Sequence, residues 1–572
     1  MKNINIIILC FLVALCSTSC ETNKETATLI IYGGPIYTMD TDDKVEAVAI
    51  KNDKILFVGS KEEAQKYQIE TTKLIDLKGK TMTPGFIEGH GHFMGLGYNE
   101  LSLDLLNTKS YQDIIEAVKE RVKTAQPGEW ITGRGWHQSK WDSLPNDMVK
   151  GFQTHYLLSE VSPDNPVYLA HASGHAGFAN EKAMEIAGIK SLDIDGIKSY
   201  NVEGGEVLVD ALGRPTGIFN ERAQTLITKH IPKKTPESDE KAFGLAVKAC
   251  HKNGITSFHD AGIPRETIEL YKKMKAEGKL KVRMYAMLTG WDKELLNEWY
   301  QSGIMVDKEH LFTIRSIKLN CDGALGSRGA WLLESYSDQP GHFGHETLPM
   351  DFVKKTAKSG LKFGFQVCAH AIGDRANREI LDNYEMALNT YPEKSKNHRF
   401  RIEHAQHLHP DDIPRFAKLE VIPAMQAIHM SSDRPWAIDR LGEKRIKEGA
   451  YMWQTLLKSG VPIVNGTDVP VEPINPIASF YASVSRKTLK GVPEEGYEPE
   501  QKMTRKQALK SYTFDAAYGA FEEDIKGSIT PGKLADFTIF NQDIMMVEET
   551  KILETQVVMT IFNGQVVYEK YQ

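Results

Sequence analysis

The sequence predicts an α/β fold: a (β/α)8 TIM barrel that carries a small composite β-sandwich and an inserted subdomain after its first strand. Eight β-rich runs that end in polar residues alternate with segments long enough for helices, as in a barrel of strand-helix units. Both ends of the chain alternate apolar and polar residues around glycine turns, as antiparallel strands do. One connection between the runs is too long for an ordinary loop.

The eight candidate barrel strands come in a regular order along the chain. They are FIEGHGH, ITSFHDAG, VRMYAML, FTIRSIKLNCDG, FGFQVCAHAIGD, FRIEHAQ, VIPAMQ and VPIVNGTDVP. We assign residues 84–525 to the barrel and, within it, about 95–241 to an insertion expected over the barrel mouth. Residues 21–83 and 526–572 would pack together as the β-sandwich, with the barrel inserted between them.

The first twenty residues, MKNINIIILCFLVALCSTSC, are typical of a secretory signal, because a lysine precedes an apolar run too short to span a membrane. The polar stretch ETNKETAT that follows is typical of a tether. We therefore expect residues 1–20 to be a lipoprotein signal peptide and Cys20 to carry a lipid anchor in a bacterial cell envelope, facing the periplasm or the surface. The alternative is simple cleavage and release of the chain.

The charge pattern favours a small-molecule partner. The formal net charge is -7 with a quarter of the residues charged, and no run of Lys and Arg indicates nucleic-acid binding. Three scattered cysteines, Cys250, Cys321 and Cys368, do not form a disulfide framework. Nothing in the sequence indicates an oligomeric state.

Six residues that can bind metal fall at the ends of five predicted strands. They are His90, His92, Lys318, His370, His404 and Asp468. Each alone has a structural explanation, such as a core histidine, a surface lysine or a turn aspartate, but their joint occurrence at one rim favours a metal site. Imidazole nitrogen and carboxylate oxygen suit zinc and similar divalent ions, whereas a lysine does so only after conversion to a carbamate. His259, at the end of the second strand, is expected to support the site from behind.

The chain after the signal resembles the amidohydrolase superfamily, and more narrowly its family 3, which includes N-substituted formamide deformylase. The resemblance lies in PGFIEGHGH, IKLNCDGALGSRGAWL, CAHAIGDRA, RIEHAQ, NGTDVPVEP and GSITPGKLADFTIF, and in GRGWHQSKW and LAHASGHAGFAN of the insertion. These motifs are specific for family and fold, and less so for substrate.

The resemblance implies a centre of two divalent ions, with zinc preferred and iron, manganese or cobalt open. His90, His92 and Asp468 would hold the more buried ion, and His370 and His404 the more exposed one. Carboxylated Lys318 would bridge the two ions together with a hydroxide. Asp468 would be the catalytic residue, taking a proton from that hydroxide and passing it to the leaving nitrogen.

Four further residues are candidates for substrate binding. Asp322 and Arg328 follow a strand end in a glycine-rich loop, where Arg328 would clamp a carboxylate or carbonyl oxygen. A structural pairing of Arg328 with Asp322 or Glu334 is the alternative. His175 and Trp136 in the insertion could contact substrate or serve packing alone.

The predicted reaction is hydrolysis of a C–N bond in an amide, an N-formyl or N-acyl compound, or a cyclic amide. Ester or lactone hydrolysis stays open. A deaminase of the same superfamily would need a glutamate three residues after His370, where this chain has Gly373. From another class, a non-catalytic small-molecule-binding lipoprotein would be expected to have lost ligands, and all six are present.

Overall fold

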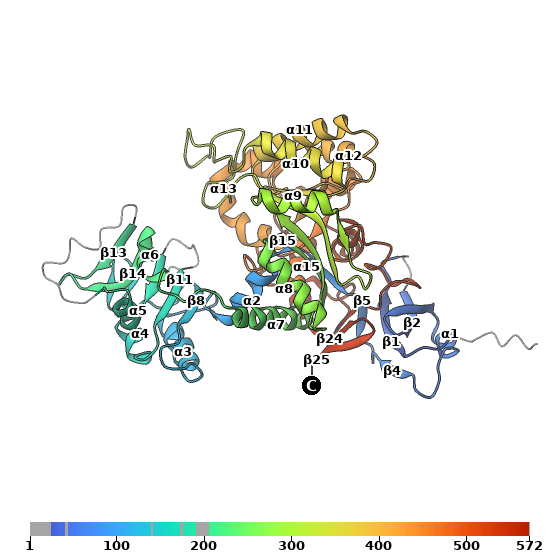
Figure 1. Cartoon of the computed structure of the whole chain (residues 1–572), viewed down its shortest axis with the longest axis horizontal. Helices are drawn as coiled ribbons and strands as arrows, with labels where there is room; N and C mark the ends of the chain where they lie inside the picture. Colours follow the sequence, from blue (N-terminus) through green and yellow to red (C-terminus); the bar gives the residue numbers. More distant parts are fainter. Residues whose placement is uncertain (1–24, 41–43, 139–140, 172–175, 190–204, 571–572) are drawn as a thin grey trace, which may run out of the picture.

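The computed structural model describes residues 25–40, 44–138, 141–171, 176–189 and 205–570. Its centre is a sheet in which eight parallel strands run in the order β22-β21-β20-β19-β18-β16-β15-β6, with β17 (Met305–Val306) added antiparallel to β18. The parallel strands are β6 (Phe86–Gly91), β15 (Ile255–Ile263), β16 (Arg283–Thr289), β18 (Phe312–Asn320), β19 (Gln366–Ala371), β20 (Arg401–His404), β21 (Ile422–Met425) and β22 (Val464–Asn465). This is the predicted (β/α)8 barrel (Figure 1).

The barrel is nearly closed, because its two end strands lie against one another. A Cβ atom at Gly89 of β6 would stand only 2.4 Å from the carbonyl oxygen of Asn465 in β22, so this contact requires glycine. Just beyond β22, the backbone N–H of Asp468 donates to the carbonyl of His90 (2.8 Å). The first and eighth strands thus carry their polar ends to the same place.

Helices follow the strands and cover the outside of the barrel. They are α2 (Phe93–Leu101), α7 (Pro236–Lys252), α8 (Arg265–Ala276), α9 (Lys293–Ser302), α10 (Met350–Phe363), α11 (Asp374–Thr390), α12 (Ile413–Leu419), α13 (Ala427–Gly449), α14 (Trp453–Lys458), α15 (Pro476–Ser485), α16 (Arg505–Ser511) and α17 (Phe514–Tyr518). Their apolar faces pack on the strands in one large core. Among the described residues, no helix is both long and apolar enough to cross a membrane.

The two ends of the chain share one sheet. It combines β1 (Leu29–Tyr37), β2 (Lys44–Lys51), β3 (Lys54–Gly59), β4 (Lys73–Asp76) and β5 (Thr81–Pro84) with β23 (Phe537–Phe540), β24 (Val557–Phe562) and β25 (Gln565–Glu569). The antiparallel pair β5 and β23 joins the N-terminal to the C-terminal strands. Successive residues of β1 point to opposite faces of the sheet, and Ile30 and Ile31 belong to separate apolar clusters. Both faces of this sheet are therefore packed.

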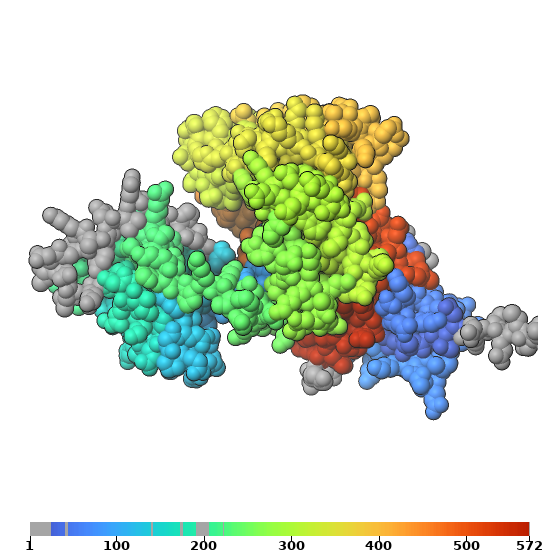
Figure 2. All heavy atoms as spheres, in the orientation of Figure 1, coloured from blue at the N-terminus to red at the C-terminus, as the bar shows by residue number. Residues whose placement is uncertain are grey.

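The insertion is a domain with its own sheet and its own core. Its strands run in the order β13-β14-β12-β11-β8-β7. The elements are β7 (Leu103–Asp104), α3 (Tyr111–Val122), β8 (Ile131–Trp136), α4 (Tyr156–Val161), β11 (Val167–His171), β12 (Ala176–Ala179), α5 (Glu181–Ile186), β13 (Gly205–Val209), β14 (Pro215–Glu221) and α6 (Thr225–Thr228). Figure 1 shows it beside the barrel, connected through α2 and α7, and Figure 2 shows open space between it and the α10 to α13 side.

Candidate metal centre

All six predicted ligands lie at the C-terminal ends of barrel strands or directly after them. His90 lies one residue before the end of β6, His92 caps α2, Lys318 lies in β18, His370 in β19, His404 at the end of β20, and Asp468 follows β22. The side chains converge: Asp468 Oδ1 is 3.6 Å from His90 Nε2 and 3.2 Å from His92 Nε2. Lys318 Nζ lies 3.3 Å from His90 Nε2, and the His404 ring lies 5.0 Å from the His90 ring and 4.4 Å from the His370 ring.

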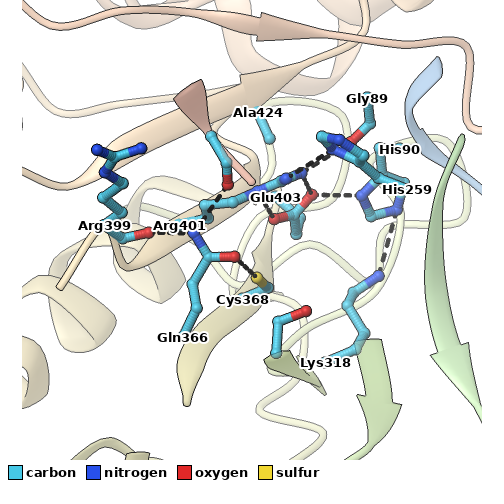
Figure 3. Close-up of polar contacts among 12 residues, drawn as sticks. Gly89, His90, His259, Lys318, Gln366, Cys368, Arg399, Arg401, Glu403 and Ala424 are labelled. Atoms are coloured by element: carbon cyan, nitrogen blue, oxygen red, sulfur yellow. Dashed lines mark hydrogen bonds and ion pairs between the residues drawn. The ribbon is translucent and has the colours of Figure 1, made fainter. Parts of the chain in front are cut away.

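His90 is oriented by a buried ion pair beneath the site. Its Nδ1 contacts Glu403 Oε2, which leaves Nε2 directed toward Lys318 and Asp468. Arg401 holds Glu403 through both carboxylate oxygens, at 2.7 Å and 2.8 Å, and also donates to the Gly89 carbonyl (2.8 Å). Figure 3 shows this series of contacts running from Lys318 to Arg401. A carboxylate on the second ring nitrogen is the usual device that fixes the tautomer of a metal-binding histidine.

The charges of this network support one another. The charge of Arg401 and the contact with His90 hold the pKa of Glu403 well below its ordinary value, although burial alone would raise it. Burial, assisted by the charge of Lys318, lowers the pKa of His90 to about 4. His90 is therefore a neutral imidazole at neutral pH, which is the form that binds metal. His259 reaches the other side of Arg401, at 3.1 Å, and does not enter the group of ligands.

Asp468 is held by its backbone as well as by its side chain. Buried Glu88 accepts from the backbone N–H of Thr467 (2.6 Å) and from its hydroxyl (3.0 Å), which fixes the residue before Asp468. Asp468 itself has a φ of +56°, a conformation that an ordinary residue adopts only where the surroundings enforce it. Its Oδ1 is buried and makes no hydrogen bond, so a ligand atom is left available.

The His370 and His404 side is supported differently. Gln426, the residue after β21, places its Oε1 2.6 Å from His404 Nδ1, so that the Nε2 atom faces the centre. His404 has a φ of +74° at the point where β20 ends. His370 Nε2 lies 3.2 Å from Asp322 Oδ1 and makes no hydrogen bond. His404 thus offers its Nε2 to the centre, while the His370 ring packs against that of His404 with its Nε2 beside Asp322.

Lys318 is a buried amine within reach of His90. Burial lowers its pKa, against the opposing effect of the negative charges on Glu403 and Asp468. A lower pKa increases the share of neutral amine, which is the form that reacts with carbon dioxide. Carboxylation of Lys318 remains a prediction.

The structure gives three of the four predicted substrate contacts, Asp322, Arg328 and Trp136, other surroundings. Asp322 accepts from the backbone N–H groups of Trp331, Ile372 and Gly373 at 2.8–3.0 Å, so its carboxylate ties two loops together behind His370. Arg328 pairs with Asp338 at 2.8 Å, and not with Asp322 or Glu334.

Of the two insertion candidates, the structure describes only Trp136. Trp136 is 0 % exposed in the core of the insertion, and its indole N–H donates to the Leu169 carbonyl (2.9 Å), which makes it a packing residue. His175 lies outside the described residues.

Several important residues were missed by the sequence reasoning. Arg401 and Glu403 lie within the RIEH strand. Because they are two residues apart, both side chains point to the face opposite Ile402, and this pattern could have identified them from the sequence. Gln426 ends the seventh strand, but an amide is not a typical metal ligand, so the residue drew no attention. Glu88 shares β6 with His90, and in sequence it is an isolated acid.

The donor set fits a divalent cation. The ligand atoms of His90, His92 and Asp468 all lie within 4.8 Å of one another, and imidazole nitrogens with a carboxylate oxygen form a common zinc environment. The orphaned Oδ1 of Asp468 and Nε2 of His370 are buried polar atoms that a cation would satisfy.

Comparison with known proteins agrees with this fold. Residues 73–568 match the model of the amidohydrolase family. The Bacillus subtilis protein YtcJ is 32% identical over 95% of this chain and 99% of its own length. N-substituted formamide deformylase of Arthrobacter pascens is 26% identical over 95% and 98%. The crystal structure of an uncharacterised metal-dependent hydrolase from Pyrococcus furiosus superposes with a TM-score of 0.71 at 28% identity, covering 91% of this chain and all of that one.

Proposed function

Because this chain belongs to the amidohydrolase family, we propose that it hydrolyses a C–N bond of a small amide, N-formyl or N-acyl compound, or cyclic amide. The observation that carries the proposal is the convergence of His90, His92 and Asp468, with the carboxylate oxygen of Asp468 buried and unbonded. The similarity to N-substituted formamide deformylase over nearly the whole chain supports an amide substrate.

The centre would hold two divalent ions, preferably zinc. His90, His92 and Asp468 would bind one, His370 and His404 the other, and carboxylated Lys318 would lie between them. When bound, such ions activate water near neutral pH and polarise a carbonyl group.

The protein's own residues then manage the proton. Asp468 accepts the proton of the attacking water at its carboxylate and delivers it to the leaving nitrogen, which must depart protonated. The contacts with His92, whose Nε2 lies 3.2 Å from Oδ1, and with His90 hold the pKa of Asp468 well below its ordinary value against the effect of burial. The carboxylate is therefore ionised at neutral pH, which is the form that a proton acceptor requires.

The structure argues against a deaminase site. Such a site would need a glutamate at position 373, but a Cβ atom there would stand 2.1 Å from the carbonyl oxygen of Trp331. The loop that Asp322 ties down leaves room only for glycine.

A substrate screen tests the proposed reaction. Purified enzyme loaded with zinc would be offered N-formyl, N-acyl and cyclic amides beside matched esters and lactones. We expect release of amine from at least one amide and no release by Asp468→Asn. Turnover of esters or lactones alone would refute C–N hydrolysis, and absence of any turnover would favour the non-catalytic binding lipoprotein.

The carbamate has a test that does not depend on activity. Protein supplied with carbon-13-labelled bicarbonate should show a carbamate signal by NMR, and Lys318→Ala should lack it. Absence of the signal from metal-loaded wild type would contradict the bridging role.

Export and a lipid anchor at Cys20 form a separate part of the proposal. Expressed in a bacterium, the full chain should incorporate labelled fatty acid and fractionate with the envelope, while Cys20→Ala should do neither. Recovery of unlabelled wild-type protein as a soluble, cleaved form would indicate release instead.

A further inference from the structure

A histidine outside the six ligands faces the same centre. His429 lies in the first turn of α13, directly after β21 and three residues beyond Gln426. Its ring is nearly parallel to that of His404, with centroids 6.1 Å apart and an interplanar angle of 14°. His429 is among the residues that lower the pKa of Asp468. His429 therefore lies on the seventh-strand side of the predicted centre.

This histidine carries a buried nitrogen without a partner. His429 is 7 % exposed, and its Nε2 makes no hydrogen bond with any described residue. By contrast, His90 and His404 each have one ring nitrogen fixed by Glu403 or Gln426. A buried polar atom left unbonded is destabilising, so its presence beside the centre points to a bound molecule as the missing partner.

The carboxylate of Asp433 lies beside His429, and we call these two side chains the recognition edge. Asp433 follows His429 by four residues, so both side chains lie on one face of α13. Gln406, two residues after His404, donates to Asp433 Oδ2 (3.2 Å). Burial, together with the charge of Glu472, raises the pKa of Asp433 to about 6 even though His429 opposes this shift. Asp433 thus lies where the segments after β20, β21 and β22 meet.

The charge of Asp433 is not neutralised by the neighbouring arginine. Arg434, the neighbour of Asp433, is engaged by Glu498 at 2.7 Å. Among the residues that the structure describes, Asp433 has hydrogen bonds only from the neutral Gln406 amide and, at 3.4 Å, from the Ser432 hydroxyl. A carboxylate supported only by neutral donors is suited to receive an ammonium group or an N–H donor.

We propose that His429 and Asp433 form the substrate-recognition edge of this site and select amides whose substituent carries an amine or another N–H donor. His429 Nε2 hydrogen-bonds the substrate next to the scissile amide, and Asp433 receives the amine of the substituent. This inference rests on the proposed amide hydrolysis, since it names the class of amide.

Hydroxamates test the inference without any turnover, because they bind metal centres and are not cleaved by this route. Three probes of equal chain length would be compared by calorimetry on zinc-loaded protein: 6-aminohexanohydroxamate, its uncharged alkyl analogue, and the analogue ending in a carboxylate. We expect the amino probe to bind wild type roughly tenfold more tightly than the carboxylate probe, as one hydrogen bond to a charged group provides.

Two variants separate the two residues. Asp433→Asn should reduce the preference for the amino probe to near unity, and His429→Gln should weaken all three probes alike while zinc content stays unchanged. Asp411→Asn, an exposed aspartate changed in the same way, should leave every affinity as in wild type. Both variants would first be checked for wild-type circular dichroism.

Each contrary result has a distinct meaning. Equal or tighter binding of the carboxylate probe by wild type, or a preference retained in Asp433→Asn, would overturn the role of Asp433. Unchanged binding by His429→Gln would overturn that of His429, and loss of zinc from this variant would make His429 a ligand instead. Failure of all three probes to bind would overturn the recognition edge as a whole. If no amide is hydrolysed although the probes bind as expected, the proposed reaction fails and the recognition edge stands.

Discussion

The two sides of the predicted centre are supported by different chemistry. On the first side, Glu403 places a carboxylate on His90 Nδ1 and is itself held by Arg401. On the second side, Gln426 holds His404 Nδ1 with a neutral amide oxygen. Hydrogen bonds that involve a charged group are roughly twice as strong as neutral ones. The first side is therefore the more rigidly prepared, and we expect it to bind its ion more tightly.

The backbone adds to this difference. Asp468, on the first side, follows a residue fixed through two hydrogen bonds to Glu88. Within the part of the chain that the structure describes, the His370 side chain, on the second side, has only the nearby carboxylate of Asp322, which is already used by three backbone N–H groups. We therefore expect the first side to hold its ion firmly and the second side to exchange its ion more readily.

The largest effect is expected at Asp468. Asn at this position keeps the shape of the side chain and loses the ability to accept a proton, so kcat should fall by about a thousandfold. The measurement is kcat on the best amide, with zinc content determined on the same samples. A variant that keeps wild-type kcat would show that the first side does no proton transfer.

Glu403→Gln should weaken the first ion next most strongly. The variant loses the charged support of His90 and leaves Arg401 without its partner, so we expect zinc affinity to fall roughly 10–100-fold. Competition with a chelator measures this, and Glu443→Gln, an exposed glutamate, serves as control. Zinc affinity equal to that of wild type would show that the charged support from Glu403 does not strengthen metal binding on the first side.

Acid should destabilise the metal-free protein through its neutral histidines. An unfolded histidine binds a proton near pH 6.5, while burial lowers the pKa of folded His90 to about 4, so the unfolded state holds more protons between these values. The free energy of unfolding should therefore fall as pH is lowered through this window, by about 2 kcal/mol at pH 5 for His90 alone. Urea unfolding at pH 7 and pH 5 measures this fall. It should be smaller in His90→Asn, and an undiminished fall in that variant would contradict the assignment.

The smallest effect is expected at Gln426. Replacing it with alanine removes one neutral hydrogen bond to His404, worth about 1 kcal/mol, so the second ion should bind roughly fivefold more weakly. Stepwise metal release into a chelator resolves the two ions. If Gln426→Ala loses more affinity than Glu403→Gln, the order of the two sides is reversed.

The sequence predicted the parts of this site that follow directly from strand ends. His90, His370 and His404 each close an apolar run, and the ends of parallel barrel strands share one rim, so their meeting could be expected. The joining of strands from both ends in one unit, which the sequence predicted as a β-sandwich, was expected for a similar reason, because the alternation of apolar residues marks strands at both ends.

The supporting residues could not be predicted in the same way. Glu403 acts through a contact with a residue 313 positions away, and no local periodicity reports such a partner. His429 lies on a helix rather than at a strand end, so a search for ligands at strand ends did not identify it. The place of the insertion beside the barrel depends on how α2 and α7 leave it, and the pattern of a single chain does not fix that direction.

The shared end sheet also sets the order of events in folding. Strand β5 pairs with β23, and Phe86 next to it contacts Thr538, 452 residues further along the chain. The N-terminal strands are therefore synthesised first, and the edge of β5 that pairs with β23 stays unpaired until almost the whole protein has been synthesised. Contacts of such sequence separation slow folding, and an exposed strand edge invites pairing with other chains. Completion of the fold, and protection of its first strands from aggregation, depend on the last strands to be synthesised.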